Sequence, residues 1–352
     1  MKIDKNRLQK LVDQKYVNVQ KHPDVDLFIY NYGQKAQYEK AWDDLTMMCR
    51  GLILDSRGEI VSRAFNKFFN LEEHIEESSK LPPLPIEPFE VTEKLDGSLG
   101  IMYWIGDQPY IATRGSFVSD QAIKANQILK VKYSHIKFNP NYTYLTEIIY
   151  PDNRIVIDYG GMEDLILLAV IHTESGEEVD HRDYKDVLPI VKTYEGIANI
   201  SKLKDLQEDN KEGFVVRFRS GVRVKVKFEE YVRLHRLVTG VNKKTIWELL
   251  KNDQPFDELL ERVPDEFYAF VKDTKAGLEG KFKEIEGEAK YALDQIKDME
   301  TRKEQALFLK EYSKYPSVVF ALLDKQLDRV KDNIWKMIRP VAEKPYKTDI
   351  DA

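Results

Sequence analysis

Lys94 is the residue of this sequence whose surroundings best suit covalent chemistry. It follows the extended run Phe89-Glu90-Val91-Thr92 and precedes the turn Asp96-Gly97-Ser98. A lysine between the end of a strand and a glycine turn can point into a pocket in which free backbone N–H groups bind an anion. The sequence therefore predicts that the Lys94 amine attacks a phosphate.

A nucleophilic lysine needs particular neighbours, because a free lysine is protonated at neutral pH. Desolvation or nearby cations must lower the pKa of such an amine. Several basic residues in the same part of the chain are candidates for this role. They are Arg50, Lys67, Arg114, Lys225 and Lys227.

The segment Arg223-Val224-Lys225-Val226-Lys227 alternates cations with valines. Successive side chains of a strand point to opposite faces, so all three cations share one face. Such a face can bind phosphates. It can also belong to a solvated edge strand whose lysines prevent aggregation, and this segment alone favours neither interpretation.

Two acids beside strand-like runs, Glu147 and Glu212, are candidates for holding a ribose hydroxyl or a hydrated magnesium ion. Each acid taken alone is more often a turn or surface residue. Their interpretation depends on whether they lie near Lys94.

The elements that must position these residues divide the chain in two. From about residue 26 to residue 228, short β-branched and aromatic runs are separated by turn residues, which predicts a strand-rich domain of mixed sheets. After about Thr239, apolar residues recur every three to four positions, and Pro264 and Pro316 each precede a helical run. We therefore expect an α+β domain over residues 1–238 and an all-α domain over residues 239–352.

Composition indicates a soluble globular protein. Of the 352 residues, 42% are hydrophobic and 32% charged, which excludes a disordered or fibrous chain. The charged N-terminus and the shortness of the longest apolar run, residues 165–171, predict neither secretion nor a membrane span, so we expect a cytoplasmic protein. A single cysteine excludes an internal disulfide, and a net charge of −6 requires any nucleic-acid site to be local.

The order of the motifs resembles one enzyme family. Lys-x-Asp-Gly is the first motif of the covalent nucleotidyltransferases, which include polynucleotide ligases and mRNA capping enzymes. Here it belongs to an ordered series of segments: 49–51 (CRG), 62–70 (ending in KFFN), 94–99, 113–116, Glu147 with 153–156 (NRIV), 165–168, 212–215 and 225–227. KFFN and NRIV make residues 30–235 similar to the RNA ligase 1 family, typified by the phage T4 enzyme.

This resemblance implies a nucleotidyltransferase domain followed by a helical domain, and it implies roles for individual residues. Lys94 would be the adenylated nucleophile, with Glu147, Lys225 and Lys227 also catalytic. The implied ATP-binding residues are Tyr30, Arg50, Lys67, Phe69, Arg114, Glu147, Glu212, Lys225 and Lys227. Tyr231 falls at the position of a functional family tyrosine. Asp257 falls where a relative binds a divalent ion, although an aspartate at a helix start is more often an N-cap.

The activity implied is ATP-dependent RNA ligation with Mg²⁺ or Mn²⁺, joining RNA 5′-phosphate and 3′-hydroxyl ends through a lysyl-adenylate. The helical domain would favour substrates such as nicked tRNA, in RNA repair. We expect a monomer that acts beside a separate end-healing kinase and phosphatase. The alternatives are a DNA ligase or guanylyl-transferring capping enzyme, or an RNA-binding module without catalysis.

One further segment, 277–281 (GLEGK), is similar to a P-loop. Its glycine spacing is short, and Phe282 stands where a P-loop requires Ser or Thr. The two glycines instead predict a break between helices.

Overall fold

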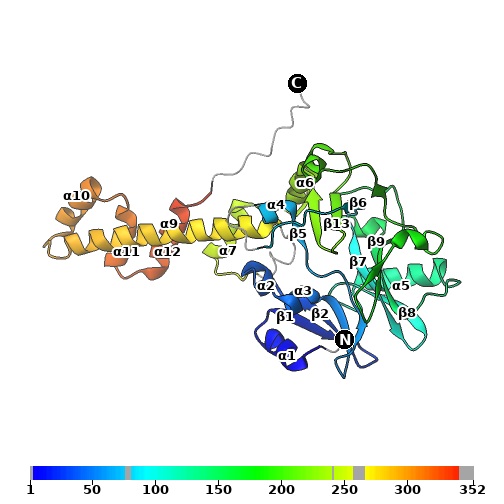
Figure 1. Cartoon of the computed structure of the whole chain (residues 1–352). Coiled ribbons are helices and arrows are strands. Elements are labelled where there is room, and N and C mark those ends of the chain that lie inside the picture. The colour runs from blue at the N-terminus through cyan, green and yellow to red at the C-terminus, as the bar shows by residue number, and fades with distance from the viewer. Residues whose placement is uncertain (1–2, 76–80, 240–241, 257–265, 341–352) are drawn as a thin grey trace. The chain divides into compact units, whose positions relative to one another are not determined.

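The computed structural model of the chain describes residues 3–75, 81–239, 242–256 and 266–340 (Figure 1). It divides into two compact units, Met1–Val238 and Thr239–Ala352. The first unit contains three β-sheets, and the second is helical in its described part. The predicted fold class, mixed sheets followed by helices, is confirmed.

The N-terminal sheet is antiparallel and has four strands in the order β1-β2-β3-β4. These are β1 (Val17–Lys21), β2 (Leu27–Tyr32), β3 (Arg50–Asp55) and β4 (Ile60–Ser62). The accompanying helices are α1 (Lys5–Asp13), α2 (Gln34–Tyr38) and α3 (Asp44–Met48). Asp4 caps α1, and Asp43 forms a capping box with Thr46 at the start of α3. A hydrophobic cluster that includes Leu8 and Leu45 packs these two helices against one face of the sheet.

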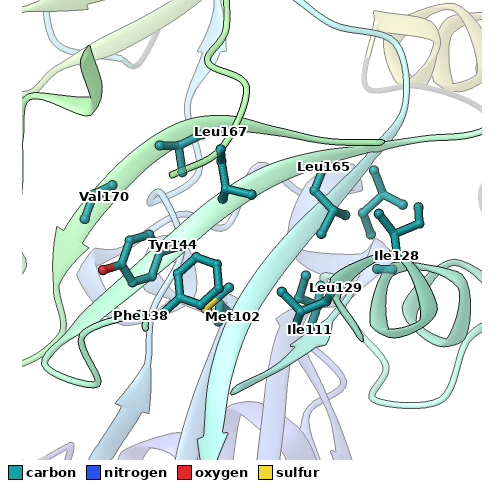
Figure 2. Packing of buried hydrophobic residues seen from close by; sticks show 12 residues of the cluster. Met102, Ile111, Ile128, Leu129, Phe138, Tyr144, Leu165, Leu167 and Val170 are labelled. Atoms are coloured by element: carbon teal, nitrogen blue, oxygen red, sulfur yellow. The ribbon is translucent and has the colours of Figure 1, made fainter. Parts of the chain in front are cut away.

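The central sheet has five strands in the order β11-β10-β9-β7-β8. They are β7 (Ser98–Ile105), β8 (Gln108–Ala112), β9 (Tyr142–Ile149), β10 (Asp164–His172) and β11 (Glu178–Val179). Helix α5 (Asp120–Lys132), capped by Ser119, packs on one face through Ile128 and Leu129 (Figure 2). The other face shares a second cluster with the N-terminal sheet, so burial on both sides explains the continuous apolar runs in these strands.

The third sheet has the strand order β12-β6-β13-β14-β5. Its strands are β5 (Phe69–Asn70), β6 (Phe89–Lys94), β12 (Thr193–Tyr194), β13 (Gly213–Phe218) and β14 (Arg223–Lys227). The elements around it are α4 (Leu71–Ile75), α6 (Glu229–Thr239) and the 3₁₀ turn η3 (Ile200–Asp205). Two other 3₁₀ turns, η1 (Pro151–Asn153) and η2 (His181–Tyr184), adjoin strands β9 and β10 of the central sheet. Val91, Val216 and Val224 belong to an apolar cluster. Period two then places the polar residues of the same strands on the opposite face.

The second unit is built on the long helix α9 (Glu266–Ile296). The other described helices are α7 (Lys243–Lys251), α10 (Arg302–Tyr312), α11 (Pro316–Leu323) and α12 (Leu327–Met337). The expectation of a helix break at residues 277–281 is wrong, because α9 continues through both glycines. Ile285 and Ala289 pack α9 against α11 and α12, and this packing outweighs the low helix propensity of glycine.

Within the described ranges, no helix is long and apolar enough to cross a membrane.

Candidate active site

Lys94 and Lys227 lie on either side of one buried carboxylate. Their Nζ atoms are 2.8 Å and 2.9 Å from the same oxygen, Oε1 of Glu212. The carboxylate side chain is 2% exposed, whereas the Lys94 side chain is 21% exposed. Lys94 is therefore held by an ion pair and still reachable by a substrate.

The register of the third sheet creates this arrangement. Gly213 pairs with Lys94 on β6 and with Lys227 on β14, so the two lysines flank the residue that follows Glu212. Gly213 has φ +147°, and a Cβ added there would lie 2.0 Å from the Val226 carbonyl oxygen. Only glycine fits this close approach of the two strands.

The lysines of β14 are internal to the sheet. β14 lies between β13 and β5, and Lys225 is buried in a row with Val215 and Asn70. The edge-strand interpretation of this segment is therefore wrong. Arg223, on the same face, is bound to Glu178 of β11 and lies 4.3 Å from the Phe65 ring, so it joins two sheets.

Glu147 on β9 is the second acid of the site. Its Oε1 accepts a hydrogen bond of 3.0 Å from the N–H of Gly97, which lies in the turn that follows Lys94. Burial raises the pKa of Glu147 to about 7, with Glu212 and Asp96 adding to the rise and Lys94 opposing it. The structure thus brings Lys94, Glu147, Glu212 and Lys227 into one electrostatically coupled group.

Tyr231 is buried beside this group. Its hydroxyl donates a 2.8 Å hydrogen bond to Oδ1 of Asp96, and its ring lies 5.2 Å from Lys227 Nζ. Tyr231 thus contacts the nucleophile turn itself, which is a position suited to orienting Lys94.

A second cluster surrounds Lys67, whose side chain lies among aromatic rings. Lys67 is 6% exposed, and its Nζ lies 5.3, 5.4 and 5.3 Å from the ring centres of Tyr32, Trp42 and Phe69. Trp42 meets Tyr32 and Phe69 edge to face. We call these three rings the aromatic cage.

Two arginines predicted to bind ATP adjoin the aromatic cage. Arg114 donates a 3.1 Å hydrogen bond to the Tyr32 hydroxyl and lies 5.3 Å from its ring centre. Arg50 lies 5.2 Å from the ring centre of Phe68. An added Cβ at Gly51 would lie 3.4 Å from Arg114 atoms, so this glycine lets the two arginine segments approach. These contacts place Arg50, Lys67, Phe69 and Arg114 in one neighbourhood.

Tyr30 lies elsewhere. It packs against the apolar cluster beneath α1 and α3, where burial raises its pKa. Tyr32, two residues further along β2, belongs instead to the aromatic cage. Sequence reasoning did not single out Tyr32. It also missed Trp42, which precedes α3 in an irregular segment without any periodic signal.

Asp257 lies outside the residues that the structure describes. Among those that it does describe, no group of three or more His, Cys, Asp or Glu side chains could hold a metal ion. Glu147 and Glu212 nevertheless fit a divalent cation in charge, because repulsion between these acids helps to raise the pKa of Glu147. A cation beside them would offset that repulsion.

Together, the mixed sheets and the basic and acidic groups brought together here fit a nucleotidyltransferase. The family model that matches the chain is the T4-type RNA ligase model, described as RNA ligase, and it covers residues 48–232. Since this match spans more than half of the sequence, the chain belongs to the T4-type RNA ligase family. The predicted enzyme class, an RNA ligase that acts on RNA ends, is thereby confirmed.

Individual relatives agree with this assignment. An RNA ligase of Rhodothermus phage RM378 is 24% identical, with 91% of this chain and 90% of the relative covered. A protein of Autographa californica nuclear polyhedrosis virus, whose name assigns it polynucleotide kinase and RNA ligase activities, is 29% identical over 65% of this chain. The match spans 36% of that viral protein's length.

Solved structures of an archaeal ATP-dependent RNA ligase are also similar. Form 1 is 15% identical, with 97% of this chain and 90% of that chain covered and a TM-score of 0.46. Form 2 is 16% identical, with 92% and 79% covered and a TM-score of 0.45. At these scores the assignment rests on the family match alone.

Proposed function

We propose that this RNA ligase uses ATP to adenylate Lys94 and then joins an RNA 5′-phosphate to a 3′-hydroxyl. The observation that carries the proposal is the Lys94 amine, partly exposed and fixed by Glu212 at the end of β6. A nucleophile held in one orientation loses less entropy on reaching the transition state.

The proposed reaction has three steps. Lys94 Nζ loses a proton and attacks the α-phosphorus of ATP, so that a P–N bond forms and pyrophosphate leaves. An RNA 5′-phosphate oxygen next attacks the same phosphorus and releases the lysine, which leaves AMP on the RNA end. The RNA 3′-hydroxyl then attacks the activated 5′-phosphorus, and AMP departs as the phosphodiester forms.

The cations of the site would stabilise the phosphates during these steps. Lys225 and Lys227 lie on the same sheet face as Lys94, while Arg50, Lys67 and Arg114 form the neighbourhood of the aromatic cage. Phosphoryl transfer depends chiefly on positioning and charge stabilisation, which suits such a basic site. A divalent ion such as Mg²⁺ or Mn²⁺ near Glu147 and Glu212 would supply further charge neutralisation.

The test is transfer of label from α-labelled ATP to the protein. Wild-type protein should become labelled, and Lys94→Ala should not, because the variant lacks the amine to which AMP is proposed to bond. Lys21→Ala is a matched control, since Lys21 also ends a strand and pairs with an acid, Asp26, at 2.8 Å. Labelled Lys94→Ala protein would disprove the proposal.

For the substrate, we propose broken RNA such as tRNA cut in its anticodon loop, bound with help from the helical unit of residues 239–352. The full chain should seal nicked tRNA faster than a linear 5′-phosphorylated RNA, and equal rates would contradict this role of the helices. DNA ends and GTP, offered in parallel, separate the proposal from DNA ligation and capping.

We further propose that the enzyme works as a cytoplasmic monomer after separate end healing. RNA with a 5′-hydroxyl or a 3′-phosphate should remain unsealed until a kinase and a phosphatase are added. Sealing of such ends by the ligase alone would show that no healing partner is required.

A further inference from the structure

The segment of residues 153–159 has no role in the steps above, yet it surrounds the turn that carries Lys94. It begins with the NRIV motif and ends at Tyr159. Its contacts with the turn are hydrogen bonds from side chains and from backbone groups, and they reach both Asp96 and Ser98.

At the centre of the turn, Asp96 is buried and accepts hydrogen bonds from this segment. Its Oδ2 accepts from the backbone N–H groups of Val156 and Ile157, at 2.9 Å and 3.0 Å. Its Oδ1 is the atom to which Tyr231 donates. Three donors therefore fix the side chain two residues after Lys94.

Tyr159 holds the backbone of the same residue. The Asp96 N–H donates to the Tyr159 hydroxyl at 2.7 Å. Burial raises the pKa of Tyr159, and the negative charges of Glu147 and Glu212 add to this rise. The Tyr159 hydroxyl therefore stays neutral and interacts electrostatically with both Glu147 and Glu212.

The far end of the turn is held by Asn153. Its Nδ2 donates to Ser98 Oγ at 3.1 Å and to the Ile148 carbonyl at 3.3 Å. Ile148 follows Glu147, whose carboxylate accepts from Gly97. Asn153 therefore ties the turn to the strand that carries the second acid.

The segment is also anchored near Glu212. Asn210 donates from Nδ2 to the Asp158 carbonyl at 2.7 Å, and its Oδ1 accepts from the Asp158 N–H at 2.9 Å. Asn210 lies two residues before Glu212 and has a left-handed backbone, φ +55°. Residues 153–159 thus connect the Lys94 turn with the start of the strand that presents Glu212.

We propose that residues 153–159 form a positioning clamp for the nucleophile, with Tyr159 as its central positioning residue. The clamp fixes the Lys94 turn against Glu147 and Glu212 and thereby sets the rate at which Lys94 attacks ATP. This inference rests on the proposed lysyl-adenylate. Small displacements of a nucleophile are costly, since attack requires close and aligned atoms.

The decisive variant is Tyr159→Phe, which removes the acceptor for the Asp96 N–H and keeps the ring. We expect kcat for Lys94 adenylation to fall by roughly 10- to 30-fold, with the KM for ATP changed by less than about twofold. Sealing of RNA that already carries AMP needs no attack by Lys94, so its rate should stay within about twofold of wild type. Tyr194→Phe is the matched control, because this tyrosine packs in the same apolar cluster and its hydroxyl pairs with Lys211 at 2.8 Å.

A merely structural role for Tyr159 would lower adenylation and sealing of pre-adenylated RNA by the same factor. That result, or unchanged adenylation, would overturn the clamp. Failure of the proposed function gives a different result, since wild-type protein itself would then form no lysyl-adenylate.

Asn210→Gly provides a second, independent test. Glycine tolerates the left-handed backbone at this position and removes both hydrogen bonds to Asp158. The same split between adenylation and sealing should appear, with a reduction in kcat of roughly 3- to 10-fold. Equal loss in both assays would count against the connection to Glu212.

Discussion

Two lysines of the first unit are held in different ways. Lys94 is 21% exposed and is paired with the carboxylate of Glu212, which it shares with Lys227. Lys67 is 6% exposed and lies inside the aromatic cage of Tyr32, Trp42 and Phe69. A carboxylate fixes an ammonium group through a short charge-assisted hydrogen bond, whereas an aromatic ring stabilises it through the ring quadrupole.

The difference matches the two tasks that we propose for these lysines. Lys94 must form a bond and therefore needs a fixed direction, which a short ion pair at the end of a strand provides. Lys67 must attract phosphate, and cation–π contacts with the three rings of the aromatic cage help to hold its amine in place.

Glu212→Gln should remove the ion pairs that Lys94 and Lys227 form with the buried carboxylate. Without the negative charge, two ammonium groups that now approach one oxygen would repel each other, and Lys94 would lose its orientation. We expect Lys94 adenylation to fall by about 100-fold or more, as measured with α-labelled ATP. Glu208→Gln is the control, since Glu208 also pairs with a lysine, Lys211, at 2.6 Å but is more exposed. Normal labelling of Glu212→Gln would refute the orienting role of this acid.

Glu147 should make the stability of the folded protein depend on pH. Its folded-state pKa of about 7 lies above the ordinary value of 4.5, so the folded protein binds the proton more tightly than the unfolded chain. This tighter proton binding stabilises the folded state fully below about pH 4.5, and the stabilisation is lost as the pH rises through 7. Glu147→Gln cannot ionise.

The variant's unfolding free energy, relative to wild type, should therefore be higher at pH 8 than at pH 5 by about 1–3 kcal/mol. Urea unfolding at the two pH values measures this difference. The glutamine can still accept from the Gly97 N–H, which makes the substitution a test of charge. The same relative stability at both pH values would contradict the raised pKa.

Trp42→Leu should weaken the aromatic cage. It removes one of three rings around Lys67 and leaves an aliphatic side chain in its place, so we expect the KM for ATP to rise by about 3- to 10-fold. Trp42→Phe keeps a ring face and should recover most of the affinity. If leucine and phenylalanine behave alike, the ring face is not what holds Lys67.

Much of this site could be predicted because its signals are local. The alternation in residues 223–227 places Lys225 and Lys227 on one face whatever the neighbouring strands are, and the turn after Lys94 is encoded by Asp96 and Gly97. The shared carboxylate could not be foreseen. It depends on β13 pairing with both β6 and β14, strands separated by more than a hundred residues of chain.

One other error has an equally physical cause. Glycine propensity predicts a break at residues 277–281, but α9 gains enough from packing against α11 and α12 to continue. Contacts between distant segments outweigh the local preference in this case.

The buried thiol of Cys49 has a practical consequence. This residue is the single cysteine of the sequence, it is fully buried in the cluster beneath α1 and α3, and burial raises its pKa to about 12. Maleimides and other thiol reagents attack thiolates, so they should leave Cys49 untouched in the folded protein. A cysteine introduced on the surface of each unit would then be labelled selectively with a fluorescent dye, and energy transfer between the two dyes could follow the enzyme through a catalytic cycle in its native background.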